Sequence, residues 1–101
     1  THSTRDRHQD HSVLAWATLR AFRKGGEIRF MESPSCRDFR PNVYVDVTES
    51  MSKKLQALRC YRTQMPRPHW KDETWLAMAG FRGMQAGVRY AEAFELHFRV
   101  E

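Results

Sequence analysis

The sequence has few of the residues that mark several common protein classes. Its 101 residues include two cysteines, Cys36 and Cys60, which form no CxxC pair, so a disulfide framework is excluded and a reducing cytoplasm is expected. No apolar run reaches the length of a membrane span, because Arg, Lys or Glu interrupts each candidate. The first ten residues also lack the apolar core of a signal peptide. We therefore expect a cytoplasmic protein without a membrane span.

An initiating methionine is also missing, since the chain begins at Thr1. A mass of 12.0 kDa is enough for one small domain with a single core and too little for two. We expect residues 1–101 to be the C-terminal portion of one domain of a longer protein.

A one-sided charge distribution is absent as well, although the net charge is +5 and the pI about 9.7. Basic and acidic residues alternate, as in Arg5-Asp6-Arg7, whereas a nucleic-acid footprint concentrates basic residues on one face. Arginine nevertheless outnumbers lysine 13 to 4, and Trp16, Trp70 and Trp75 could stack on bases. A small basic nucleic-acid-binding module therefore stays as an alternative function.

Hydrophobic periodicity predicts three helices. The first covers residues 10–24, with Asp10 as its N-cap and Gly25-Gly26 at its end. Thr48 is placed to cap the second, and Asp72 or Thr74 the third. The expected apolar faces are Leu14, Ala17, Ala21 and Phe22 in the first helix, Met51, Leu55 and Leu58 in the second, and Trp75, Met78, Ala79 and Ala86 in the third. The recurring glycines Gly80, Gly83 and Gly87 indicate close packing by another backbone, with a ligand as the less favoured interpretation.

Three strands are predicted at residues 27–31, 43–47 and 93–100. In the last one Phe94, Leu96, Phe98 and Val100 alternate with polar residues, so these four side chains should form the buried face. A proline-containing loop is expected at residues 64–70. Strands that alternate with helices indicate the α/β class.

The candidate chemistry lies near the N-terminus, where His8 and His11 flank Asp10. Imidazole is the commonest protein ligand for zinc when its second nitrogen is held by an acceptor. An HxxH pair alone is a weak signal, and without a wider pattern a surface or capping role is the better interpretation. The pair would nevertheless lie on the loop and first turn of a helix, where α/β proteins often place a ligand crevice.

A wider pattern is present. Residues 6–11 (Asp-Arg-His-Gln-Asp-His) resemble the D-x-H-P-D-H motif of LmbE-like (PIG-L) zinc-dependent N-acetylglucosaminyl deacetylases, with Gln9 in place of the usual proline. The segment Tyr90-Ala91-Glu92-Ala93-Phe94 is similar to the closing Y-A-E-x-F motif of that family. Features between the two motifs follow the same order, among them Glu32-Ser33-Pro34, Pro41, Gln64 and Arg82-Gly83. The resemblance implies the C-terminal half of a Rossmann-like three-layer sandwich with a mostly parallel sheet.

The resemblance also implies roles for individual residues. His11 matches a zinc ligand, His8 the histidine that stabilises the oxyanion or protonates the leaving amine, and Asp10 the carboxylate that orients His8. Three further residues match positions that line or brace the substrate site: Arg82, Tyr90 and Glu92. The implied cofactor is Zn²⁺, and the implied partner is a small-molecule amino-sugar conjugate whose acetamide is hydrolysed. No nucleic acid is expected, and a homo-oligomer is left open.

One part of the family pattern is missing from these residues. The H-P-D-D motif, which carries the other metal ligands and the general base, does not occur in the sequence. We therefore expect this chain to supply part of a deacetylase site, to bind zinc poorly by itself and to be inactive alone. A non-catalytic interaction fragment is the remaining alternative.

Overall fold

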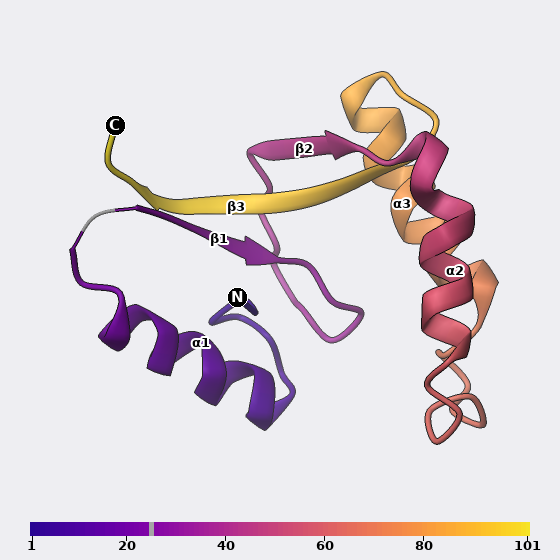
Figure 1. Ribbon diagram of the computed structural model, residues 1–101, viewed down its shortest axis with the longest axis horizontal. Helices are drawn as coiled ribbons and strands as arrows, with labels where there is room; N and C mark the ends of the chain where they lie inside the picture. The colour runs from indigo at the N-terminus through magenta and orange to yellow at the C-terminus, as the bar shows by residue number, and fades with distance from the viewer. Residues whose placement is uncertain (25) are drawn as a thin grey trace. The chain divides into compact units, whose positions relative to one another are not determined.

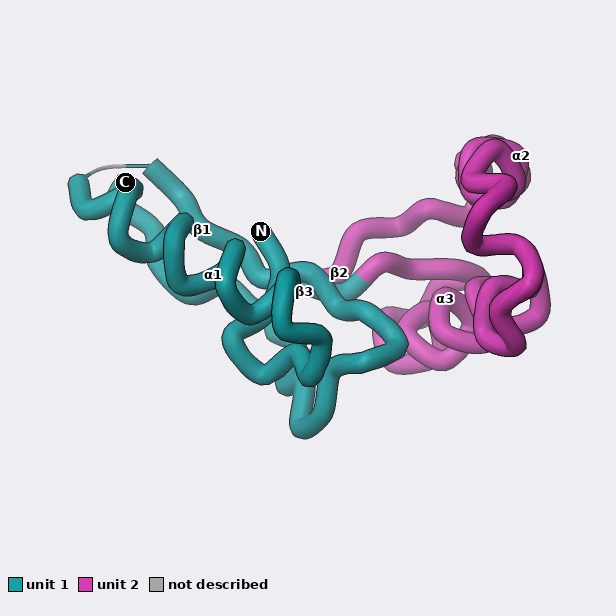
Figure 2. The backbone as a smooth tube through the Cα atoms, turned by 90° about the horizontal axis from the view of Figure 1, so that it is seen from below, with its two compact units in different colours: residues 1–43, 93–101 teal, residues 44–92 magenta. Residues whose placement is uncertain are grey.

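The computed structural model describes residues 1–24 and 26–101. Along the chain the elements are α1 (Gln9–Ala21), β1 (Glu27–Met31), β2 (Val43–Asp46), a 3-10 helix (Thr48–Ser50), α2 (Met51–Arg59), α3 (Asp72–Ala86) and β3 (Ala91–Arg99) (Figure 1). The chain divides into two compact units, which are described separately: unit 1 comprises residues 1–43 and 93–101, and unit 2 comprises residues 44–92 (Figure 2).

The three strands form a small antiparallel sheet in the order β1-β3-β2. Glu27 pairs with Arg99 and Met31 with Phe94, so β3 runs opposite to β1. β2 is also antiparallel to β3, because the N–H of Asn42 donates to Phe94 and that of Val47 to Tyr90. The expected mixture of helices and strands is thus confirmed, but the parallel sheet expected for the α/β class is not found among the described strands. Alternation of strands and helices does not fix strand direction, and β3 enters the sheet at the end where β1 finishes.

Helix α1 begins after His8, not after Asp10. His8 has extended backbone angles and its side chain accepts from the N–H of Asp10, which makes His8 the N-cap. The predicted cap was therefore two residues too late, and Asp10 instead places its charge in the first turn, where it favours the helix dipole. The helix ends at Ala21, three residues before the predicted end. Of the glycine pair expected to end it, Gly25 lies outside the described residues.

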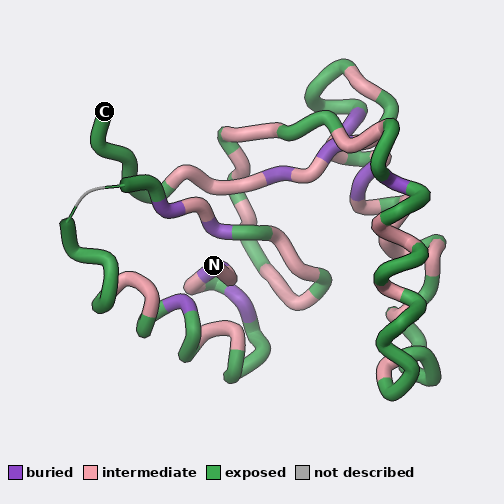
Figure 3. The backbone as a smooth tube through the Cα atoms, in the orientation of Figure 1, coloured by how far each residue is buried: buried purple, intermediate pink, exposed green. Residues whose placement is uncertain are grey.

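The buried face of α1 also differs from the prediction. Ala15 is fully buried, whereas Leu14 is 51% and Phe22 62% exposed, and most of the helix surface is open or half-open (Figure 3). Ala15 lies in unit 1 together with the buried side chains Ile28 and Phe30 of β1. Because the alanine side chain is small, the sequence pattern did not mark the Ala15 face of the helix as buried. The larger apolar residues Leu14 and Phe22 were wrongly assigned to the core.

At the start of β3, the buried and exposed faces are the reverse of the prediction. Ala91 and Ala93 are buried, while Phe98 is 37% exposed and Val100, just beyond the strand, is 57% exposed. A register shift between Ile28 and Arg29 of β1 interrupts the regular pairing opposite this strand. Such an irregularity changes which side chains point to one face, so a strict two-residue alternation does not hold along the whole strand.

The second helix of the prediction is divided in unit 2. Thr48 starts the 3-10 helix and is not a cap, and the N-cap of α2 is Ser50. The expected apolar face of α2 is confirmed, since Met51 is buried and Leu55 and Leu58 are half-buried.

Helix α3 begins after Lys71 as its N-cap, one residue before the earlier of the two predicted caps. Its most buried residues are Ala79 and Gly83, while Ala86 is exposed. A Cβ atom on Gly83 would lie 2.5 Å from the carbonyl oxygen of Arg89, so the backbone packing expected at this glycine is confirmed. Gly87 follows the helix with φ of 75°, a left-handed conformation that suits glycine.

A loop joins α2 to α3, as the prolines predicted, and Trp70 anchors it. Its indole N–H donates to the carbonyl oxygen of Leu58 at 3.1 Å, and its ring lies edge-on to Trp75 with centroids 5.3 Å apart. Arg59 at the end of α2 pairs with Asp72 at the start of α3. Among the described residues, no helix has both the length and the apolar character that crossing a membrane requires.

Candidate metal site at the start of helix α1

The N-terminal segment is held beside the end of β1 and the turn that follows it. The N–H of Met31 donates to Thr1 at 2.8 Å, and His2 forms a bridge with Met31. A second bridge joins Asp6 to Cys36. These contacts bring residues 1–8 close to residues 31–36, which are distant in the sequence.

Asp6 is the centre of the hydrogen-bond network in this site. Its side chain is fully buried, and four groups donate to it: the backbone N–H of His8 at 2.9 Å, the hydroxyls of Ser33 and Ser35, and the thiol of Cys36 at 3.6 Å. A fifth hydrogen bond joins it to Nδ1 of His11 at 2.9 Å. Burial alone would raise the pKa of Asp6, but the hydrogen bonds from Ser33, Ser35, His8 and His11 outweigh it and hold the pKa well below its ordinary value.

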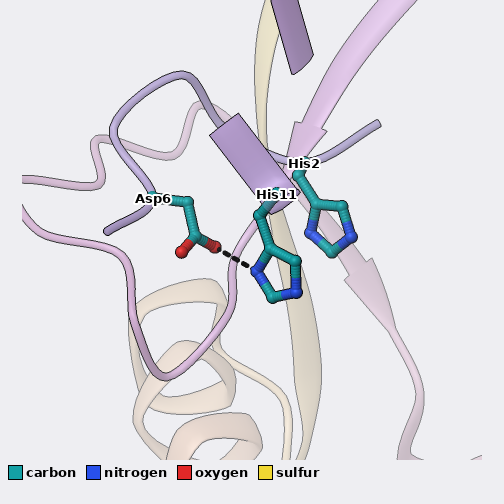
Figure 4. A group of neighbouring side chains, drawn as sticks. All are labelled: His2, Asp6 and His11. Carbon is teal, nitrogen blue, oxygen red and sulfur yellow. Dashed lines mark hydrogen bonds and ion pairs between the residues drawn. The ribbon is translucent and has the colours of Figure 1, made fainter. Parts of the chain in front are cut away.

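Three imidazole rings are stacked in the site. His2 and His11 have ring centroids 3.8 Å apart and are nearly parallel, at 2°. His8 and His11 are also stacked, with ring centroids 4.4 Å apart and an angle of 23° between the ring planes. His11 is therefore in contact with two other imidazoles as well as with the buried carboxylate of Asp6. Figure 4 shows His11 between His2 and the Asp6 carboxylate.

His2 has an unsatisfied polar atom. Its Nδ1 is buried and has no hydrogen-bond partner. Burial lowers the pKa of His2, as does a positive charge on His11, and the negative Asp6 opposes both effects only in part. A buried nitrogen without a partner is costly, and it is the kind of atom that a bound ion or water satisfies.

His2, Asp6 and His11 form a cluster that could hold a metal ion, because one ligand atom from each lies within 4.8 Å of the others. Two imidazoles and one carboxylate are a ligand set found in catalytic zinc sites. Zn–N bonds of about 2.0–2.1 Å would place ligand atoms ~3.3–3.5 Å apart, so the cluster is more open than a closed zinc site. The in-plane lone pairs of two parallel rings do not converge, and binding through both imidazoles would require one ring to rotate.

The predicted residues His8, Asp10 and His11 are brought together at this site. Nδ1 of His8 accepts from the N–H of Asp10 at 3.3 Å and lies 4.0 Å from the Asp10 carboxylate. The Asp10 side chain is 78% exposed. The carboxylate that contacts an imidazole closely is Asp6, and its imidazole is His11.

The other three predicted residues, Arg82, Tyr90 and Glu92, belong to unit 2. Nη1 of Arg82 donates to Gln85 at 2.8 Å. The guanidinium of Arg89 lies over the ring of Tyr90, 5.3 Å from its centroid. Glu92 pairs with Lys54 at 2.5 Å. Each of these side chains therefore contacts a neighbour within its own unit.

Sequence reasoning missed Asp6 and His2 as site residues. Asp6 is the first residue of the motif at positions 6–11, and it was quoted there without a role. The available signal was the pair of serines at positions 33 and 35, two hydroxyl donors next to Pro34 that can satisfy a buried carboxylate. His2 lies near the chain terminus, and its contact with Met31 leaves no mark in the local sequence.

Comparison with known proteins finds similarity over part of the chain. Part of the chain is 37% identical over 57 residues to a diacetylchitobiose deacetylase from Thermococcus kodakarensis. The match covers 52% of this chain and 21% of that protein, so the chain spans about a fifth of the length of the relative. No protein-family model matches the chain.

Proposed function

We propose that this chain is part of a zinc-dependent N-deacetylase that hydrolyses the acetamide of an N-acetylglucosamine-type substrate. The observation that carries the proposal is the grouping of two imidazoles, His2 and His11, beside the buried carboxylate that contacts His11, in a chain part of which is similar to a diacetylchitobiose deacetylase. The cluster lies at the start of α1, and two of its residues, Asp6 and His11, belong to the motif whose resemblance points to the same activity. The LmbE-like family and a Rossmann-like whole domain are parts of this proposal.

His11 is the residue that we assign to the metal. Its Nδ1 is bonded to Asp6, so its Nε2 is the nitrogen left for a ligand bond. His2 supplies the second imidazole, and its unpartnered Nδ1 fits this donor set. Zinc bound there would polarise the acetamide carbonyl and lower the pKa of the attacking water.

His8 is the residue that we assign to proton transfer. Its Nδ1 accepts from the N–H of Asp10, so in the neutral ring the hydrogen is on Nε2. The imidazole is about half exposed, which leaves Nε2–H available to the oxyanion or to the leaving amine. Asp10, 4.0 Å away, is placed to stabilise the protonated ring.

Our proposal for the second unit is narrower. Arg82, Tyr90 and Glu92 brace or line the substrate site in the complete enzyme, and the partner is a small amino-sugar conjugate, with no nucleic acid. The present contacts of Glu92 with Lys54 and of Tyr90 with Arg89 fit the bracing role.

The test uses the full-length protein and N,N′-diacetylchitobiose, with acetate release as the readout. We expect activity that a chelator removes and added Zn²⁺ restores. H11A should abolish activity and zinc binding, whereas H8A should lower kcat and leave zinc bound. H69A is the matched control, because His69 is exposed in the loop of unit 2, and it should retain activity. Undiminished acetate release by H11A would refute the proposal.

A second measurement tests the expected division of the site. The isolated 101-residue chain lacks an H-P-D-D motif, so isothermal titration should detect only weak zinc binding, and the chain should release no acetate. Tight one-to-one zinc binding by this chain alone would contradict the idea that other ligands complete the site.

A further inference from the structure

We propose that Asp6 is a positioning residue that holds neutral His11 in the Nδ1–H tautomer, so that the Nε2 lone pair of His11 is free for a ligand bond. This inference rests on the proposed metal-binding role of His11. It concerns a residue to which the resemblance assigned no role, and its first test requires no metal.

The hydrogen bonds of Asp6 leave it no proton to donate. Oδ1 accepts from the His8 backbone and from Ser35, and Oδ2 accepts from Ser33 and Cys36 and contacts His11. The backbone N–H of His8 can only donate, and the hydroxyls of Ser33 and Ser35 and the thiol of Cys36 are further donors to the two oxygens, as expected for a carboxylate that only accepts. The hydrogen in the 2.9 Å contact with Oδ2 must therefore be on Nδ1 of His11.

A neutral imidazole has one N–H and one lone pair, and the hydrogen bond at one nitrogen decides the state of the other. Once Nδ1 of His11 carries the hydrogen, Nε2 is the acceptor. Figure 4 shows this second nitrogen on the side of the ring away from the Asp6 carboxylate. A carboxylate behind a metal-binding histidine fixes ring orientation and raises the basicity of the ligand nitrogen.

His8 is held in the opposite state. Its Nδ1 accepts from the N–H of Asp10, so its neutral ring carries the hydrogen on Nε2. His8 and His11 are stacked with centroids 4.4 Å apart, yet one offers a lone pair and the other offers an N–H. Two neighbouring histidines of the motif are thus suited to different tasks by the groups bonded to their Nδ1 atoms.

The same network argues against Asp6 as a direct metal ligand. A metal bond to either oxygen would displace donors from a side chain that is fully buried, and losing a buried acceptor is costly. The Ser33 and Ser35 hydroxyls would lose the acceptor that they share. Asp6 is better suited to act through His11.

Asp6→Asn is the informative substitution, because it keeps the shape of the side chain and changes one acceptor into a donor. The amide oxygen must face the backbone N–H of His8, which cannot change its hydrogen-bonding role. The NH₂ group then faces Nδ1 of His11, which becomes the acceptor. The hydrogen of the neutral His11 ring moves to Nε2, where it blocks a ligand bond.

The experiment is long-range ¹H–¹⁵N NMR of the histidine rings in the metal-free protein, at a pH where the rings are neutral. In the wild type, His11 should show a protonated Nδ1 and a lone pair on Nε2, and His8 the reverse. D6N should invert the His11 pattern and leave that of His8 unchanged. D46N, the same chemical change at an exposed aspartate of unit 2, should change neither. A wild-type His11 with its hydrogen on Nε2 overturns the inference, and so does a D6N protein with an unchanged His11 pattern.

Zinc titration of the full-length protein separates this inference from the proposed function. D6N should weaken zinc binding by about 10- to 100-fold, the usual effect of removing a carboxylate behind a ligand histidine. Equal zinc affinity in D6N and the wild type overturns the positioning role of Asp6. A wild-type protein with the expected tautomers but without zinc binding contradicts the proposed function and leaves the tautomer assignment standing.

Discussion

Asp6 in unit 1 and two carboxylates of unit 2 are held in different ways. In unit 1 the side chain of Asp6 is fully buried and accepts from backbone, hydroxyl and imidazole groups. In unit 2 Asp72 and Glu92 are partly exposed and pair with Arg59 and Lys54. Buried, fully bonded groups impose one geometry, whereas exposed ion pairs contribute little and are screened by salt. Precise placement of side chains is thus concentrated in unit 1, where the candidate metal site lies.

Asp6→Ala should have the largest effect on this contrast. It leaves the His8 N–H and the Ser33 and Ser35 hydroxyls without their buried acceptor, and each unsatisfied buried donor should cost about 1–3 kcal/mol of unfolding free energy. Amide hydrogen exchange in β1 and α1 is the measurement, with α2 and α3 as the internal reference. Equal loss of protection in both units would contradict a network confined to unit 1.

Acid should act on unit 1 through the same carboxylate. The pKa of Asp6 lies below its ordinary value of 3.8 because hydrogen bonds outweigh burial. A lowered folded-state pKa adds stability above the ordinary value and loses it as the pH falls below about 4 toward the folded-state pKa. We expect unit 1 to lose protection in this range and D6N to remove most of the pH dependence. A stability that is flat from pH 5 to pH 2 would refute this linkage.

Gly83→Ala is the corresponding change in unit 2. Its Cβ would meet the carbonyl oxygen of Arg89 at 2.5 Å, and overpacking of this kind costs about 1–3 kcal/mol. Gly80→Ala on the same helix is the control, because only the Tyr90 ring lies near, at 4.0 Å. Alanine should stabilise α3 there by up to about 1 kcal/mol. Urea denaturation should place the two variants on opposite sides of the wild type.

The sequence predicted local structure better than long-range placement. The face of α2 formed by Met51, Leu55 and Leu58 follows from helical spacing alone and is confirmed. The direction of β3 depends on how it pairs with β1, which no local pattern encodes. The N-cap was misplaced because Asp10 is the stronger capping residue by type, whereas the turn around buried Asp6 places His8 at that position.

The candidate site shows the same difference between local features and long-range contacts. His8 and His11 are neighbours on one turn, so their proximity could be predicted from spacing. The role of Asp6 depends on Ser33 and Ser35, 27 and 29 residues farther along the chain. His2 enters through its bridge to Met31. Residues that join the site through contacts across the fold cannot be predicted from the motif, however specific the motif is.

The smallest expected effect concerns Glu92. Glu92→Gln removes the charge that pairs with Lys54 at 2.5 Å, and both side chains are about one-third exposed, so stability should fall by ~0–1 kcal/mol. Lys54→Met breaks the same pair from the other side and should have a similar effect on the urea midpoint.

Comparing these two variants in the full-length enzyme decides between the two roles proposed for Glu92. If Glu92 only braces the site through Lys54, E92Q and K54M should change KM equally. If the carboxylate touches the substrate, E92Q should raise KM more than K54M does, because K54M leaves the carboxylate in place. We expect equal effects, since the carboxylate is already bonded to Lys54 within unit 2. An increase in KM in E92Q alone would mean that a side chain of unit 2 is also positioned to contact the substrate. That result would weaken the contrast between the units.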